Sequence, residues 1–306
     1  MLLSLPLELV LLVLDNLDLP SLTDFLAASP RLTTDITTIA PSLVTKNPTL
    51  LHLAASRDQP TLLTHLLTLL PATAFDVHKK TPLYRAAESG TLATLQLLLS
   101  LGTVEPIRFF ASESPLTVAA RRGHLAAVHT LLPTSIQSIG KALIAASAAG
   151  HTEIAVLLLE HTKERSVLSS AICSAAAVGS HEIIALLQFA GAKPGNADAD
   201  GSTPLHHAAR AGRTEILELL IRNGGVKVDA QDAHGWTALH WGMFGEYKSV
   251  VELLIAAGAD REITNDDGMP AGGWPEEAEE AVGNVAAEDV VEGQAVDAAM
   301  LVEVSS

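Results

Sequence analysis

Apolar and small residues recur along this chain in blocks of similar layout, and the clearest block spans residues 201–225. In it, Thr203 and Pro204 predict the start of a short helix, because a hydroxyl can cap the first turn and proline is tolerated there. Gly212 predicts the end of that helix at a left-handed residue. Thr214 predicts the cap of a second helix, which carries five branched apolar residues: Ile216, Leu217, Leu219, Leu220 and Ile221. Neither helix can bury its apolar face alone, so the block must stack on neighbours.

Six other blocks repeat this layout. The residues equivalent to Leu205 are Leu51, Leu83, Leu116, Leu143, Ile172 and Leu239. Most of them are followed by an Ala pair, then by a Gly at the helix end, then by a Leu pair in the second helix. This recurrence predicts a repeat array over residues 46–270, with about seven copies and a partial C-terminal one. The two shortest steps, on either side of Leu143, predict repeats whose connecting hairpins are short or missing.

A tetrapeptide at the start of the first helix carries a family resemblance. Residues 203–206 read Thr-Pro-Leu-His, and residues 81–84 and 237–240 differ from that tetrapeptide at one position each. Asp200-Gly201 and His234-Gly235 stand where a turn would precede the helix. With this period, the series resembles the ankyrin repeat. The resemblance implies an all-α ankyrin-repeat solenoid, built of helix-turn-helix repeats with short hairpin loops, whose concave face binds other proteins.

The first residues of the chain are apolar enough to suggest a signal peptide or a membrane span. However, Glu8 lies inside the apolar run, no basic residue precedes it, and Asp15 and Asp18 interrupt it. A signal peptide needs a basic start, and a membrane span needs about 20 apolar residues. The segment therefore predicts two soluble helices, the first beginning after Ser4 and the second ending at Pro30.

Three short motifs in this segment carry a second resemblance. They are Leu-Pro-x-Glu at residues 5–8, Asp-Leu-x-x-Leu at 18–22 and Ala-Ser-x-Arg-Leu at 28–32. The series resembles the F-box, and an F-box followed by ankyrin repeats is similar to a class of fungal proteins. The resemblance implies a helical module over residues 1–45 that binds the Skp-type adaptor of cullin–RING ubiquitin ligases through Leu5, Pro6, Glu8, Leu9, Leu19 and Leu22. The alternative is that these helices only cap the exposed face of the first repeat.

Charge is distributed unevenly along the chain. The formal net charge is −16, yet residues 262–306 contain acids and no Lys or Arg. We expect residues 271–306 to form an acidic, mostly disordered tail. The remainder offers no basic stripe of the kind that a nucleic acid demands, so nucleic-acid binding is not predicted. A single cysteine and the lack of a signal peptide favour an intracellular location, cytoplasmic or nuclear.

Residues that could carry catalysis or bind metal are explained by the repeat itself. Cys173 has no base near it in sequence and is expected to be a buried, inert thiol. No histidine pair has the i, i+4 spacing of a helical metal site. The sequence therefore predicts no metal, no cofactor and no enzymatic activity. Six histidines occupy fixed places in the repeat, where we expect each to hydrogen-bond an adjacent turn: His52, His124, His151, His181, His206 and His240.

Two groups of side chains are candidates for contact with a partner protein. Arg121 and Arg122, and the equivalent Arg210 and Arg213, are expected at the ends of first helices, on the concave side. The alternative is that these arginines only complement helix dipoles. The second group is aromatic, in a chain with only 4% aromatic residues, and consists of Trp236, Trp241, Phe244 and Tyr247. Such residues are enriched in interface hot spots but also close the ends of cores.

These features predict an interaction adaptor with no active site of its own. The N-terminal module would bind a Skp-type adaptor, the repeats would hold an unidentified substrate protein, and proximity would promote ubiquitin transfer. The alternative is a plain ankyrin-repeat scaffold with no link to ubiquitin. Neither a nucleic acid nor a membrane is predicted as a partner, and the chain is expected to be a monomer outside its complexes.

Overall fold

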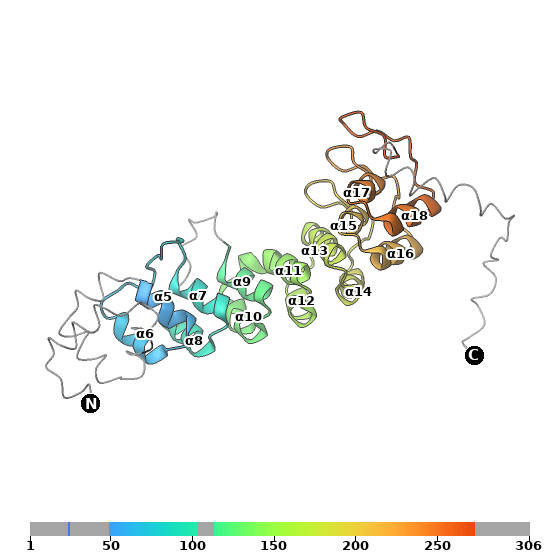
Figure 1. Ribbon diagram of the computed structural model, residues 1–306. Helices are drawn as coiled ribbons and strands as arrows, with labels where there is room; N and C mark the ends of the chain where they lie inside the picture. Colours follow the sequence, from blue (N-terminus) through green and yellow to red (C-terminus); the bar gives the residue numbers. More distant parts are fainter. Residues whose placement is uncertain (1–23, 25–48, 103–112, 273–306) are drawn as a thin grey trace, which may run out of the picture.

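The computed structural model describes residues 24, 49–102 and 113–272, which form a bent stack of helix pairs (Figure 1). The first helices of the pairs are α5 (Thr49–Ser56), α7 (Pro82–Ser89), α9 (Pro115–Arg122), α11 (Ile139–Ala149), α13 (Arg165–Val178), α15 (Pro204–Arg210) and α17 (Ala238–Phe244). The second helices are α6 (Pro60–Leu66), α8 (Leu92–Ser100), α10 (Leu125–Leu131), α12 (Thr152–Leu159), α14 (His181–Phe189), α16 (Thr214–Arg222) and α18 (Lys248–Ala256).

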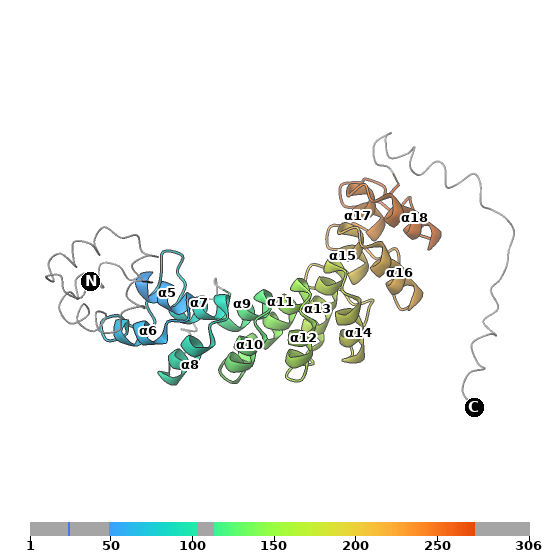
Figure 2. The same ribbon diagram turned by 60° about the horizontal axis from the view of Figure 1, so that its bottom comes forward.

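The helices lie in two rows, seen from two directions in Figures 1 and 2. Each first helix packs against the first helix of the next pair and against its own second helix. We call the row from α5 to α17 the inner row, because it lies on the side toward which the stack bends (Figure 1). The described residues contain no β-strand, only one isolated bridge between Thr264 and Pro270. The expected all-α solenoid is confirmed.

Hairpin loops precede some inner helices and not others. Tight turns occupy residues 76–80, 198–202, 232–236 and 265–269, each closed by a main-chain hydrogen bond between its first and last residues. Before α11 the chain instead makes two short 3-10 turns, η2 (Leu132–Thr134) and η3 (Ile136–Ser138), and before α13 only residues 160–164 intervene. The repeats around the two shortest sequence steps therefore lack the hairpin, as their spacing predicts.

The ends of the helices follow the residue types that the sequence places there. In α7, the Thr81 hydroxyl accepts the Tyr84 N–H, a proline follows the cap, and Gly90 ends the helix with a φ of 72°. Glycine takes such a left-handed conformation without steric cost. One expectation is wrong: α16 has Arg213, not Thr214, at its N-cap, because the Arg213 backbone (φ −89°, ψ 75°) already lies outside the helical region.

The core lies between the two rows and is made mostly of Ala and Leu. Small residues on the inner helices let neighbouring helices approach closely, while Leu side chains from both rows, such as Leu116 of α9 and Leu131 of α10, fill the space between them. Ten alanines of the repeated pairs are fully buried: Ala54, Ala55, Ala86, Ala87, Ala119, Ala120, Ala175, Ala176, Ala208 and Ala209. A larger side chain at these positions would force the helices apart, which typically costs about 1–3 kcal/mol.

Side chains at the N-caps of outer helices tie successive repeats together. In four repeats, the N-cap side chain donates a hydrogen bond to a carbonyl near the C-terminal end of the inner helix of the preceding repeat, where carbonyls lack partners within the helix. The expected role of His124 and His151 is thereby confirmed. His181 is the first residue of α14 and is exposed, because Ser180 holds the N-cap there. The four contacts are Thr91 to Ala55, His124 to Glu88, His151 to Arg121 and Arg213 to Ala177.

Several expectations concern residues outside the described ranges. These are the helices of residues 1–45 with the adaptor-binding candidates Leu5, Pro6, Glu8, Leu9, Leu19 and Leu22, and the tail beyond residue 272. The repeat structure continues to Gly272, whose N–H donates to the Arg261 carbonyl at 2.8 Å. In the portion of the chain that is described, no helix combines the length and the apolar character that crossing a membrane requires.

Candidate protein-binding surface

Three hairpins hold an aspartate against the inner helix that follows. One carboxylate oxygen of each aspartate accepts two main-chain N–H groups of its own turn, at 2.8–3.0 Å. The other oxygen contacts the side chain nine positions later. The three pairs are Asp76 with Arg85, Asp198 with His207, and Asp232 with Trp241. The repeat backbone thus fixes where the contact occurs, and the residue on the inner helix decides its chemistry.

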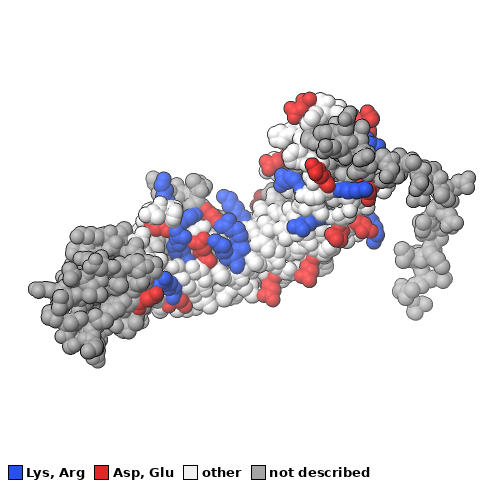
Figure 3. Space-filling model, in the orientation of Figure 1, with Lys and Arg blue, Asp and Glu red and all other residues white. Residues whose placement is uncertain are grey.

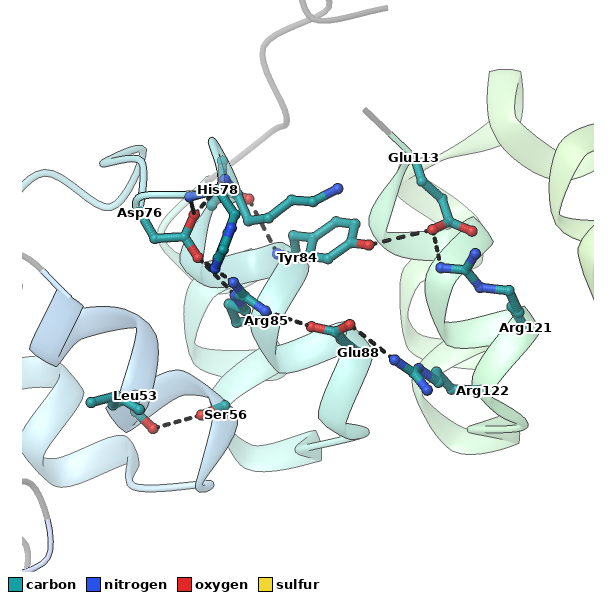
Figure 4. A network of polar contacts seen from close by, with 12 residues as sticks. Leu53, Ser56, Asp76, His78, Tyr84, Arg85, Glu88, Glu113, Arg121 and Arg122 are labelled. Carbon is teal, nitrogen blue, oxygen red and sulfur yellow. Dashed lines mark hydrogen bonds and ion pairs between the residues drawn. The ribbon is translucent and has the colours of Figure 1, made fainter. Parts of the chain in front are cut away.

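Ion pairs cover the inner helices α7 and α9 (Figure 4). Arg85 donates to Asp76 Oδ2 at 2.6 Å and to Glu88 at 2.9 Å, while Arg122 reaches the second oxygen of Glu88 from α9 at 3.2 Å. Burial would by itself raise the pKa of Asp76. The main-chain N–H of Lys80 and the guanidinium of Arg85 outweigh burial and hold that pKa below its ordinary value.

Tyr84 and Arg121 extend this network toward the next repeat (Figure 4). The Tyr84 hydroxyl donates to Glu113 Oε2 at 3.3 Å, and Arg121 pairs with the same oxygen. Burial and the Glu113 carboxylate raise the pKa of Tyr84 to about 12, so the phenol stays a proton donor at neutral pH. The side chains of Arg121 and Arg122 are 50% and 55% exposed. Both arginines therefore lie on the accessible surface and are already paired with carboxylates.

The surface in the middle of the stack carries few charged side chains. Figure 3 shows Lys and Arg gathered among acids around α7 and α9, whereas the surface over α11 and α13 is mostly uncharged. The inner helices there end in small or apolar residues such as Ala148 and Val178, both exposed. Side chains that could bind a partner protein are thus concentrated in two separate parts of the inner row. The first is the network of ion pairs on α7 and α9.

The second of these parts is an aromatic cluster at α15 and α17, which we define as Trp236, Trp241, Phe244 and Arg210. The two indoles lie 4.6 Å apart between ring centroids, and Phe244 meets both of them edge-on, at 5.7 and 6.2 Å. The Arg210 guanidinium lies over the Trp241 ring at 5.3 Å. Trp241 Nε1 donates to Asp232 Oδ2 at 3.0 Å, which fixes its orientation. Phe244 is 56% exposed, so the cluster presents apolar surface to solvent.

Two of the predicted partner-binding residues, Arg213 and Tyr247, are exposed and also hold a position in the scaffold. The Arg213 side chain lies against Gly179 and donates to the Ala177 carbonyl at 3.1 Å. The Tyr247 ring covers Gly212 in the same way, so closely that a Cβ at Gly212 would approach the ring to 2.9 Å. Arg213 and Tyr247 thus occupy the N-cap position that His124 and His151 fill in other repeats. The structure brings together Arg210 with Trp236, Trp241 and Phe244, but not Arg213 or Tyr247.

Histidines in the first helices serve the scaffold. His206 Nδ1 accepts the Thr203 N–H, and its Nε2 donates to the carbonyls of Ala230 and Trp236 at 2.9 and 3.0 Å. Burial, the largest influence, lowers the pKa of His206, so the neutral ring that this pattern needs is favoured. His52 and His240 make the same kind of contact with the next loop. The expected hydrogen bonds between adjacent turns are confirmed for these three residues.

Cys173 takes the place of such a histidine in α13. Its thiol donates to the Ser202 carbonyl at 3.4 Å, and burial together with the charge of Asp198 raises its pKa. His207 lies close by, but its Nε2 bonds Asp198 at 2.7 Å and its Nδ1 faces Arg210 at 3.4 Å. Both ring nitrogens are engaged and the thiol is protonated, so the group is not arranged as a nucleophile and its base. Sequence reasoning missed this grouping because its members come from separate elements.

Comparison with known proteins agrees with this geometry. Residues 172–265 match the family described as ankyrin repeats, with three copies. Residues 172–265 are ankyrin repeats. It is also 32% identical over 155 residues to the ankyrin repeat and KH domain-containing protein mask-1 of Caenorhabditis elegans. That alignment covers 48% of this chain and 6% of the relative.

Proposed function

We propose that this chain is a protein-interaction adaptor whose ankyrin repeats hold a partner protein on their inner face, without catalytic activity of its own. The observation that carries the proposal is the aromatic cluster, with Phe244 more than half exposed beside two indoles in contact and Arg210. Aromatic and arginine side chains dominate the hot spots of protein interfaces. Rings that already pack against one another also lose little conformational freedom when a partner binds.

The repeat surface can be tested by comparing two exposed phenylalanines. Phe244 belongs to the aromatic cluster, whereas Phe189 ends the outer helix α14 and is 95% exposed. Full-length chains carrying Phe244→Ala, Arg210→Ala or Phe189→Ala are used as baits, and captured proteins are quantified against wild type. We expect a partner whose capture falls about tenfold or more with Phe244→Ala and is unchanged with Phe189→Ala. Equal capture by all baits would contradict the proposal for this surface.

We further propose that residues 1–45 link the captured protein to a ubiquitin ligase by binding a Skp-type adaptor. The support is the sequence resemblance of this segment to the F-box, together with repeats that can supply a substrate-holding surface. Simultaneous binding would place the partner and the ligase in one assembly and raise their effective concentration. This role implies a cytoplasmic or nuclear protein.

A titration of the Skp-type adaptor tests this link. The full chain is compared with Leu5→Asp and Pro6→Ala variants and with a chain that begins at Lys46, and circular dichroism checks that the repeats stay helical. Micromolar or tighter binding that these changes abolish is the expected result. If a folded full-length chain does not bind the adaptor, residues 1–45 are a cap and the chain is a scaffold without a link to ubiquitin.

A further inference from the structure

One group of side chains borders the aromatic cluster, since His207 contacts Arg210, and it has metal-binding chemistry of its own. Ligand atoms of Cys173, Asp198 and His207 all lie within 4.8 Å of one another, and no other group of three such ligands occurs in the described ranges. Cys173 comes from α13, Asp198 from the following hairpin, and His207 from α15. A thiolate, an imidazole and a carboxylate are together a ligand set that suits zinc and similar divalent transition metals.

Equivalent positions in two other repeats provide an internal comparison. The hairpin of Asp76 lies between His52 and Arg85, and the hairpin of Asp232 lies between His206 and Trp241. Guanidinium and indole N–H groups are donors that cannot ligate a cation. The repeat backbone therefore brings three side chains together at each of these hairpins, but only the hairpin of Asp198 brings together three that can bind a metal.

We propose that Cys173, Asp198 and His207 form a binding site for a divalent transition metal of the zinc type, which joins α13 to the next repeat. Bonds of about 2.0–2.3 Å to a tetrahedral zinc ion keep ligand atoms less than about 4 Å apart. Side-chain rotations that shift these atoms by about 1 Å or less complete the site. Three protein ligands leave one coordination position for water or for a group of a bound partner.

The local contacts are compatible with this rearrangement. Asp198 is held by its other oxygen, which accepts the N–H groups of Asp200 and Ser202 at 3.0 Å, so Oδ2 can move from His207 to a metal without loss of the turn. The side chains of His207 and Asp198 are 16% and 12% exposed, which allows entry from solvent. On binding, the Cys173 thiol loses its proton to the buffer. The His207 proton moves from Nε2 to Nδ1, so the exposed Arg210 guanidinium, which donates to Nδ1 at 3.4 Å, turns away into solvent.

Cobalt(II) is a spectroscopic probe for the site, because a thiolate bound to cobalt gives a charge-transfer band in the near ultraviolet. Cys173 is the chain's one cysteine, so any such band reports on this position. Reduced full-length protein is titrated with cobalt(II), then with zinc(II). We expect a band that saturates at one equivalent, tetrahedral absorption in the visible range, and loss of both when zinc is added.

Variants separate this site from adventitious binding. Cys173→Ser should abolish the band, and His207→Asn should weaken cobalt binding by about tenfold or more. His161→Asn, at an exposed histidine after α12, should leave both unchanged. Asp198→Asn keeps a hydrogen-bond acceptor for the turn and provides an independent variant if Cys173→Ser folds poorly. Absence of a thiolate band in the wild type, or a band that is unaffected by His207→Asn and Asp198→Asn, would overturn the proposal.

Discussion

The hairpins before α7 and before α17 have nearly the same backbone, but the side chains around the first are charged and those around the second are aromatic. Asp76 and Asp232 each accept two N–H groups of their own turn and one side chain from nine positions later. Before α7 that side chain is Arg85, which belongs to an ionic network. Before α17 it is Trp241, which belongs to an aromatic cluster. A repeat scaffold can therefore vary its surface without changing the contact that holds its loops.

Removing the shared aspartate should have the largest effect on stability. Asp232→Ala removes two charge-assisted main-chain bonds and leaves the indole N–H of Trp241 without its acceptor, so we expect a loss of about 3 kcal/mol in the free energy of unfolding. Asp76→Ala should cost about 1 kcal/mol less, because Arg85 keeps its bond to Glu88. Urea denaturation followed by circular dichroism measures both.

The control for these variants is Asp200→Ala, at an exposed aspartate in another hairpin. Exposed substitutions of this kind usually change stability by less than about 0.5 kcal/mol. A similar loss for Asp200→Ala and Asp232→Ala would mean that aspartates in these loops stabilise the fold through general charge effects, rather than through the contacts described for Asp232.

Replacing Trp241, the inner-helix side chain that bonds Asp232, should have a smaller effect on stability. Trp241→Phe keeps a ring beside Trp236 and Arg210 but removes the N–H that bonds Asp232, whose side chain is buried. We expect a loss of about 1–2 kcal/mol, because a buried carboxylate oxygen is left without that donor. The loss should be insensitive to salt, since one partner is neutral. Repeating the denaturation at low and high ionic strength checks this, and a strong salt dependence would contradict the assignment.

The sequence predicted those parts of the structure that depend on residue type and spacing. Thr81, Pro82 and Gly90 define α7 from its cap to its end, and the role of His206 followed from its place in the repeat. The missing hairpins before α11 and α13 were also predicted, because a shorter repeat leaves no residues to build them.

Contacts between repeats were less predictable where the residue type at an equivalent position changes from one repeat to the next. Arg213 and Tyr247 were predicted only as partner-binding residues, and their second role, covering Gly179 and Gly212 of the preceding repeat, was not predicted. Cys173 and His207 were treated separately, although α13 and α15 bring them together. Residue spacing within one helix predicts neither the glycine contacts of Arg213 and Tyr247 nor the proximity of Cys173 and His207.

Acid should weaken the ionic hairpin. The pKa of Asp76 in the folded protein lies below its ordinary value of 3.8, so its carboxylate contributes stability above that pH. This contribution is lost as the pH falls through the folded pKa. We expect wild type to lose more stability than Asp76→Asn between neutral pH and about pH 3, measured by urea midpoints at each pH. Parallel curves for the two proteins would show that other carboxylates govern acid unfolding.

The smallest effect is expected at the rim of the ionic network. Arg122 is 55% exposed and pairs with Glu88, which also bonds Arg85. Exposed ion pairs contribute little, so Arg122→Gln should change the free energy of unfolding by less than about 0.5 kcal/mol at low salt. At high salt the change should vanish, and a loss above 1 kcal/mol in denaturation at either ionic strength would contradict this view.

An arginine that the fold does not need is available for a partner. If Arg122→Gln leaves stability unchanged but reduces partner capture, both parts of the inner row contribute to binding, whereas an effect confined to Phe244→Ala assigns binding to the aromatic cluster.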